Sequence, residues 1–217
     1  MKKGKKKKGK KENGLKGQKN VQFEEGLRVH EIMRLPHLSG RRGLAIDGGA
    51  HVGSWTILLS EYFYKVHAFE PCSESYQMLV ENMADRSCNA GLVAVHNKAL
   101  MDKACKVDVK APRPKKKVLT ARQVTYGTEV DGIAIDDMNL ECCDLIKLDL
   151  EGAEPLAIAG ALSTIIRFKP FLVIEFNARI PDRFDITVSD MEETLKDLGY
   201  EEVWRNDVDR GFSCKRP

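Results

Sequence analysis

The stretch LAIDGGAHVGSWTILL, residues 44–59, joins two apolar segments through an aspartate and three glycines. Residues 43–46 form a short apolar run typical of a buried strand, and residues 54–64 carry one apolar face, as an amphipathic helix does. The glycines between them allow a tight turn and a close approach of the backbone to a ligand. We therefore expect a strand, a glycine-rich loop and a helix whose first N–H groups face a ligand.

Strand-like and helix-like segments alternate along the rest of the chain. We expect strands at residues 65–71, 91–100, 144–150 and 170–176, helices at 73–83, 154–168 and 188–198, and two closing strands at 200–205 and 211–216. A short helix ending near Pro36 precedes them. This alternation predicts a mostly parallel α/β sheet. Residues 101–137 differ, because short β-like runs broken by prolines and by lysines 115–117 predict a β-rich excursion with an exposed basic loop.

The net charge of +3 is unevenly distributed over the 217 residues. Residues 1–20 contain ten lysines and one glutamate, a charge of +9, which leaves the remaining chain at −6. The first twenty residues have too few apolar side chains to offset their ordering entropy, so we expect a disordered tail followed by one domain over residues 21–217. Such a tail is either a weak, nonspecific hook for nucleic acid or another anionic surface, or a solubilising segment.

The composition also restricts the cellular setting. No apolar run approaches the roughly 20 residues that cross a bilayer, and no apolar segment follows the basic N-terminus as in a secretory signal. Six cysteines, at positions 72, 88, 105, 142, 143 and 214, show no zinc-binding spacing and read as reduced thiols. We expect a cytoplasmic protein without a membrane span and without a bound metal.

Polar residues gather where the expected strands end, and parallel α/β sheets bind ligands beyond the carboxyl ends of their strands. Carboxylates are costly near an apolar interior unless they have a role, which favours function over structure. The residues at these ends are Asp47, Glu70, Asn97 with Lys98, Asp149 with Glu151, and Glu175 with Asn177.

Asp47 and Glu70 together indicate the kind of ligand. The spacing of Gly48, Ala50 and Gly53 is only a degenerate dinucleotide fingerprint, and a carboxylate at Asp47 would repel a pyrophosphate while suiting a cationic amino-acid end. Glu70 follows 23 residues later, where an acidic residue accepts hydrogen bonds from ribose hydroxyls. Taken alone, Asp47 could cap a helix and Glu70 could be a surface charge. The pair describes S-adenosylmethionine.

Three motifs in order give the chain a family resemblance. They are D-x-G-A-x-x-G at residues 47–53, F-E-P at 69–71 and K-x-D-x-E-G-A-E at 147–154. Over residues 44–177 the chain resembles the FkbM-type S-adenosylmethionine-dependent methyltransferases. The resemblance implies a class I methyltransferase (Rossmann-like) fold, with a mostly parallel seven-stranded sheet and an antiparallel last strand. It also implies methyl transfer to a hydroxyl of a sugar, glycan or small-molecule acceptor.

The resemblance assigns roles to individual residues. Cofactor contacts would come from Asp47, Gly48, Gly49, Ala50 and Gly53 at the methionine end, Glu70 and Pro71 at the ribose, Asn97, Lys98 and Ala99 near the adenine, and Asp149. The catalytic motif facing the methyl group would be Lys147, Asp149 and Glu151, with Asp149 the first choice as general base ahead of Glu151, Glu175 and His51. Residues 101–130 and the last 40 residues match no motif and should shape the acceptor site.

Other functions remain open at this point. The lysine tail and the basic loop favour a nucleic-acid or protein methyltransferase, although the tip of the fourth expected strand lacks the N/D-P-P-Y/F tetrad of amino-methylating enzymes. A non-catalytic S-adenosylmethionine-binding protein of the same fold would carry the same cofactor residues. A dinucleotide oxidoreductase is disfavoured by Asp47.

Overall fold

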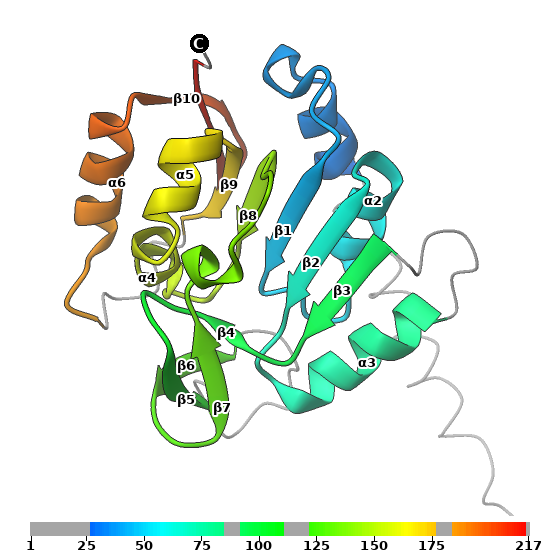
Figure 1. Ribbon diagram of the computed structural model, residues 1–217, viewed down its shortest axis with the longest axis vertical. Coiled ribbons are helices and arrows are strands. Elements are labelled where there is room, and N and C mark those ends of the chain that lie inside the picture. The colour runs from blue at the N-terminus through cyan, green and yellow to red at the C-terminus, as the bar shows by residue number, and fades with distance from the viewer. Residues whose placement is uncertain (1–26, 85–91, 111–121, 177–183, 216–217) are drawn as a thin grey trace, which may run out of the picture.

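The structure, a computed structural model, describes residues 27–84, 92–110, 122–176 and 184–215 (Figure 1). The expected disordered tail, the lysines at 115–117 and Asn177 lie outside the described residues. The first described turns are a helix at residues 27–33 and a short 3-10 helix, η1 (Pro36–Leu38), as expected near Pro36. No helix of the described residues is long and apolar enough to cross a membrane.

A seven-stranded sheet forms the centre of the molecule, in the order β10-β11-β9-β8-β1-β2-β3. All neighbouring pairs are parallel except the two made by β11, which runs antiparallel to both β9 and β10. The predicted fold, mostly parallel with an antiparallel last strand, is confirmed. The strands are β1 (Leu44–Gly48), β2 (Lys65–Phe69), β3 (Val93–His96), β8 (Leu145–Leu148), β9 (Phe171–Glu175), β10 (Tyr200–Arg205) and β11 (Asp209–Cys214).

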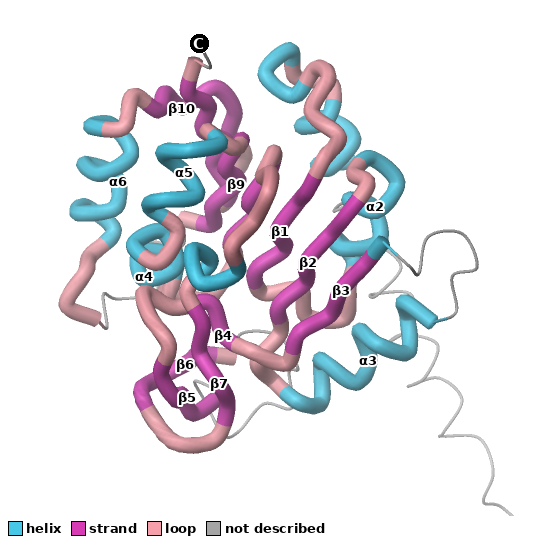
Figure 2. The backbone as a smooth tube through the Cα atoms, viewed as in Figure 1, coloured by secondary structure: helices cyan, strands magenta, loops and turns pink. Residues whose placement is uncertain are grey.

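Helices cover this sheet on both faces (Figure 2). They are α2 (Ser54–Tyr62), α3 (Ser73–Ala84), α4 (Glu154–Ala159), α5 (Leu162–Phe168) and α6 (Val188–Asp197). Successive strand residues point to opposite faces, so Leu44 and Ile46 pack with α4, α5 and α6, while Ala45 between them packs with α2 and the helix at 27–33. This alternation explains why the central strands are apolar at nearly every position.

One predicted helix, residues 154–168, is two helices. The helix is interrupted at Gly160, where a Cβ atom would lie 2.1 Å from the Met101 carbonyl oxygen. The Gly160 carbonyl accepts a hydrogen bond from the Asp136 N–H at 2.9 Å, and the Asp136 carboxylate accepts hydrogen bonds from the Ser163 and Thr164 N–H groups at 2.9 and 2.8 Å at the start of α5. A contact with a distant segment therefore ends one helix and begins the next.

A second correction concerns the predicted strand at residues 91–100. β3 ends at His96, and residues 99–100 belong to a separate four-stranded sheet of order β4-β7-β5-β6. Asn97 marks the break, because its side chain donates to the carbonyl oxygens of Glu70 and Pro71 at 2.9 and 3.1 Å. The small sheet consists of β4 (Ala99–Leu100), β5 (Cys105–Lys110), β6 (Gln123–Tyr126) and β7 (Val130–Ile133).

The small sheet confirms the predicted β-rich excursion, although the last two residues of the β-like run at 130–136 belong to a 3-10 helix, η3 (Ile135–Met138). Its strands fold back beneath the carboxyl ends of the main strands (Figure 1). Val107 and Val124 pack there against Ala153 and Leu156 at the start of α4. The small sheet thus forms part of the surroundings of the strand tips, where a ligand is expected.

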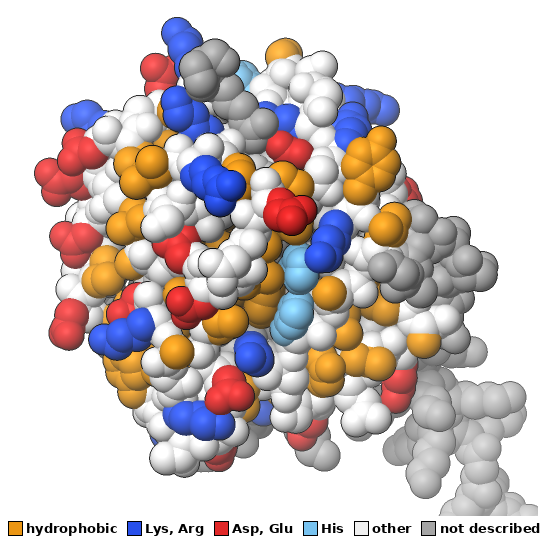
Figure 3. All heavy atoms as spheres, viewed as in Figure 1, with side chains coloured by type: hydrophobic (Ala, Val, Ile, Leu, Met, Phe, Trp, Pro, Cys, Tyr) orange, Lys and Arg blue, Asp and Glu red, His pale blue; other side chains and the backbone are white. Residues whose placement is uncertain are grey.

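The face of β2 and β3 that carries no described helix is covered by aromatic rings instead. His67 and His96 are joined by a hydrogen bond of 2.9 Å between ring nitrogens, and His96 stacks on Phe69 at a centroid distance of 4.5 Å. Figure 3 shows histidine side chains at the surface over these strands. Burial, followed by the charges of His96 and Lys65, lowers the pKa of His67 to about 4, so this ring is neutral at pH 7.

Candidate functional site

The carboxyl ends of β1, β2 and β8 border a cavity of about 170 Å³. Most of the predicted site residues line it: Gly49, Ala50, Glu70, Pro71, Lys98, Ala99, Lys147, Asp149 and Glu151. His51 also lines it. Five predicted residues are absent from the lining: Asp47, Gly48, Gly53, Asn97 and the candidate base Glu175. The parallel sheet therefore brings the three sequence motifs together at one edge.

Gly49 sets the closeness of β1 to β8. Its φ is +73°, and a Cβ atom built there would lie 1.8 Å from the Asp149 carbonyl oxygen. Gly49 and Ala50 both donate their N–H groups to the Phe69 carbonyl oxygen, at 3.0 and 2.9 Å. A glycine is required here by conformation and by space, because any side chain would collide with the backbone of the neighbouring strand tip.

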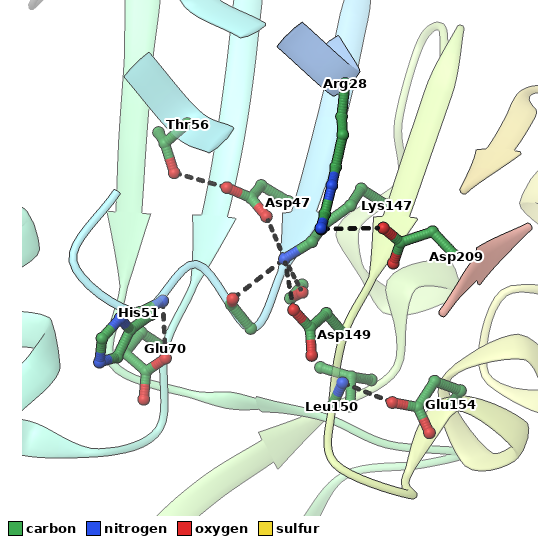
Figure 4. A network of polar contacts seen from close by, with 12 residues as sticks. Arg28, Asp47, His51, Thr56, Glu70, Lys147, Asp149, Leu150, Glu154 and Asp209 are labelled. Atoms are coloured by element: carbon green, nitrogen blue, oxygen red, sulfur yellow. Dashed lines mark hydrogen bonds and ion pairs between the residues drawn. The ribbon is translucent and has the colours of Figure 1, made fainter. Parts of the chain in front are cut away.

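Glu70 joins the glycine-rich loop to the start of α3. Its side chain is 6% exposed, and it accepts hydrogen bonds from the N–H groups of His51 and Cys72 at 2.9 and 2.8 Å (Figure 4). Burial raises the pKa of this carboxyl above its usual value, and the two N–H donors oppose that shift. Each carboxylate oxygen keeps a further lone pair, so Glu70 can accept more hydrogen bonds from a ligand.

Asp47 faces the interior of the protein. It is 0% exposed, its Oδ2 accepts a hydrogen bond from Thr56 Oγ1 at 2.6 Å, and its Oδ1 lies 3.1 Å from Lys147 Nζ (Figure 4). The ammonium of Lys147 therefore holds the place beside Asp47 that the sequence had suggested for the amino group of a ligand. Asp47 and Lys147 are register partners on β1 and β8. Their opposite charges are the sequence feature from which this ion pair could have been predicted.

Lys147 fixes the backbone around it. Its Nζ donates to the carbonyl oxygens of Gly48 and Gly49 at 3.2 and 3.1 Å, in addition to the Asp47 contact. The two contacts with carbonyl oxygens are hydrogen bonds, and the contact with Asp47 is an ion pair. The Asp149 Oδ2 atom lies farther away, at 3.7 Å, so its contact with Lys147 is chiefly one of charge. Lys147 thus positions the glycine-rich loop and the Asp149 carboxylate.

Acidic side chains surround Asp149 on its other side. Glu154 accepts hydrogen bonds from the N–H groups of Leu150 and Gly152 at 2.5 and 2.9 Å, and burial raises its pKa to about 7. Burial raises the pKa of Glu175 to about 9, and the charge and hydrogen bond of Asp149 add to this shift, followed by Glu151 and Glu154. At neutral pH Glu175 is protonated and can donate a hydrogen bond to Asp149, whose side chain is 41% exposed.

The cavity lining also includes residues that belong to none of the three motifs and were not predicted, among them Ser75 and Arg122. Ser75 lines the cavity from the first turn of α3, and Arg122 lines it from the small sheet, where its guanidinium donates to Glu74 at 2.5 Å. Arg122 lies in a predicted β-like run that matches no family motif, so only the folding of the small sheet reveals its position at the cavity.

The comparisons with known proteins agree with this geometry. The model of the "Methyltransferase FkbM domain" family matches residues 47–202. Methyltransferase FkbM from Methylobacillus flagellatus KT superposes with a TM-score of 0.59 at 22% identity, over 82% of this chain and 46% of that one. Magnesium protoporphyrin IX methyltransferase from Synechocystis PCC 6803 with bound SAM superposes with a TM-score of 0.51 at 14% identity, over 91% and 83% of the two chains.

The chain spans about half the length of the Methylobacillus protein. No curated protein matches its sequence. The structural neighbours share the class I methyltransferase fold, and the family model covers most of the chain. The chain belongs to the FkbM methyltransferase domain family.

Proposed function

We propose that this domain is an S-adenosylmethionine-dependent methyltransferase that acts on a hydroxyl of a sugar, glycan or small molecule. The observation that carries the proposal is the cavity, which has the glycine-rich loop and Glu70 on one side and Asp149 on the other. Free thiols at the described cysteines fit the reducing cytoplasm.

The residues around the cavity fit this cofactor. The close approach of Gly49 to the β8 tip leaves backbone rather than side chain against the ligand, and the unused lone pairs of Glu70 suit ribose hydroxyls. Pro71 and Ala99 add apolar surface nearby for a purine ring. Because Asp47 is paired with Lys147, its proposed contribution is indirect: it holds the lysine that holds the loop. When bound, S-adenosylmethionine supplies an electrophilic methyl group on a sulfonium.

Asp149 is the proposed general base. Its side chain is partly exposed, and it lines the cavity at the tip of β8. In the proposed reaction Asp149 would accept the proton of the acceptor hydroxyl as the hydroxyl oxygen takes the methyl group that the bound cofactor would supply, with the thioether as the leaving group. Lys147 orients Asp149 by charge, and protonated Glu175 can donate a hydrogen bond to Asp149.

Calorimetry with S-adenosylmethionine, with NAD as the comparison ligand, tests the cofactor. Micromolar binding of S-adenosylmethionine alone supports the proposal and leads to an acceptor screen that begins with glycans. Binding of NAD instead would favour an oxidoreductase, and binding of neither would reject the cofactor site.

Asp149→Asn tests the base. It should lower turnover strongly while leaving cofactor affinity within a few-fold, because the amide keeps the shape of the side chain but cannot accept the proton. Normal turnover by this variant would remove Asp149 from the mechanism. Cofactor binding by the wild type without turnover on any acceptor class would favour a binding protein of the same fold.

A further inference from the structure

Arg122 connects two parts of the protein across the cavity. It lies directly before β6 of the small sheet. Its Nη2 atom donates a hydrogen bond of 2.5 Å to Oε2 of Glu74, which lies in the first turn of α3. Arg122 and Ser75, which follows Glu74, both line the cavity. The ion pair therefore ties the small sheet to the helix that begins just after Glu70.

Two polar atoms in this wall are buried and have no hydrogen-bond partner among the described residues: Arg122 Nε and Ser75 Oγ. Ser75 is only 1% exposed. Buried N–H and O–H groups nearly always have a partner, because an unmet donor loses its bond to water without compensation. Two such atoms in the wall of one cavity point to a ligand that supplies the missing acceptors.

The ion pair of Arg122 with Glu74 indicates which chemical class of ligand the site would bind. Glu74 already balances the guanidinium, so the group that remains for a ligand is a directed N–H donor rather than a free cation. This favours a neutral acceptor over a phosphate or carboxylate. The position next to Glu70 and Pro71 is where the ribose and base of a nucleoside would lie, and a purine offers ring nitrogens while a ribose offers hydroxyl oxygens as acceptors.

We infer that Arg122 and Ser75 bind the nucleoside part of the cofactor, with Arg122 Nε donating to a purine nitrogen or ribose oxygen. The small sheet would thereby complete this end of the cofactor site, and Glu74 would hold the guanidinium in place. The inference rests on the proposed function, because it takes an adenosyl cofactor to fill the cavity.

Calorimetry with S-adenosylhomocysteine on four variants tests the inference. Arg122→Ala and Arg122→Lys should both bind about tenfold more weakly, since a bond from a charged donor is lost in each. Lysine can still pair with Glu74 but has no Nε, so rescue by lysine would show that only the ion pair matters and would overturn the inference. Arg205→Ala is the matched control, because Arg205, whose side chain is 63% exposed, pairs with Glu202 within β10, away from the cavity lining, and this variant should bind like the wild type.

Ser75→Ala separates binding from folding. Its hydroxyl has no partner within the described protein, so its loss should leave the melting temperature of the free protein unchanged or higher while weakening S-adenosylhomocysteine binding several-fold. A lower melting temperature with unchanged affinity would assign the serine a structural role instead. The melting temperature of each arginine variant is measured in the same way to verify that it folds.

Modified ligands identify the accepting atom. Analogues of S-adenosylhomocysteine that lack N1, N3, N7 or one ribose hydroxyl are compared on the wild type and Arg122→Ala. One analogue should bind the wild type more weakly than S-adenosylhomocysteine does, but should bind Arg122→Ala as tightly as S-adenosylhomocysteine does. The atom that this analogue lacks is then the hydrogen-bond partner of Arg122. Equal losses on both proteins for every analogue would overturn the inference.

Two remaining outcomes also decide the question. Inorganic phosphate serves as an anion probe, and loss of phosphate binding in Arg122→Ala with unchanged S-adenosylhomocysteine affinity would make this an anion site for an acceptor and would overturn the inference. Wild-type protein that binds no S-adenosylhomocysteine would reject the proposed function itself. Wild-type binding with unaffected arginine variants would reject the inference alone.

Discussion

Replacement of Lys147 by methionine is the sharpest test of how the site is held together. Methionine keeps the length and apolar stem of lysine but removes the ammonium. The substitution leaves Asp47, which is 0% exposed, as a buried carboxylate whose remaining described partner is Thr56. It also removes the donor to the carbonyl oxygens of Gly48 and Gly49.

The expected cost follows from this geometry. Breaking one partner of a buried ion pair costs about 3–5 kcal/mol, because the other charge stays buried. For a chain of this size each kcal/mol lowers the melting temperature by about 2–4 °C, so Lys147→Met should lower it by roughly 6–20 °C. The double variant Asp47→Asn, Lys147→Met removes both charges and should be less destabilised than the sum of the two single variants, by about 1.5 kcal/mol or more.

Urea unfolding followed by tryptophan fluorescence measures these free energies, and Trp55, whose ring centroid lies 5.8 Å from Lys147 Nζ, serves as a local probe. Lys106→Met is the matched control, because Lys106 pairs with Asp131 at 2.8 Å while both side chains are 54% exposed. The control should shift the unfolding midpoint little, since solvent screens an exposed pair. A Lys147→Met variant no less stable than Lys106→Met, or simple additivity in the double variant, would refute the buried-pair argument.

Three further substitutions have defined outcomes. Gly49→Ala should unfold the domain or remove cofactor binding, because the new Cβ atom would clash with the Asp149 backbone. Gly40→Ala is the control: Gly40 has a similar φ of +75° but open space around it, so the substitution should lower the stability by only about 1–2 kcal/mol. Melting curves of both variants check this. Glu175→Gln should flatten the pH dependence of stability. The raised pKa of Glu175 means that the folded chain keeps a proton which the unfolded chain releases, so wild-type stability falls as pH rises from 4.5 to about 9. Urea unfolding midpoints across that range should fall less in the variant than in the wild type. Thr187→Ala removes a capping box at the start of α6 and should cost about 1 kcal/mol, and a cost near zero in urea unfolding would contradict the capping bonds seen there.

The main sheet could be predicted from the sequence because its strands are apolar runs separated by helical periodicity. Local pattern could not place the break at Gly160, which depends on Met101 and Asp136 from a distant segment. The same holds for the end of β3, which is set by hydrogen bonds from Asn97 to the preceding strand tip. In both cases a tertiary contact overrides the local preference.

The candidate site also has a part that the sequence could predict and a part that it could not. Motif residues meet at one edge because parallel strands place all their carboxyl ends together. Which of their side chains face the cavity depends on pairing across strands, so the burial of Asp47 against Lys147 became visible only with the register of β1 and β8. Arg122 carries no motif at all, and its place at the cavity follows from the fold of the small sheet.

The small sheet also bears on how such a domain could diversify. The chain leaves the main sheet through β4 and returns through β7, and these two strands lie side by side with Leu100 opposite Ile133. Because the two ends of the excursion adjoin, the segment between them can change in length or sequence at little entropic cost to the rest of the fold. We therefore expect that the segment between Leu100 and Ile133 can be exchanged for that of a relative while the main sheet stays unaltered, and such a graft shows which properties of the cavity this segment determines.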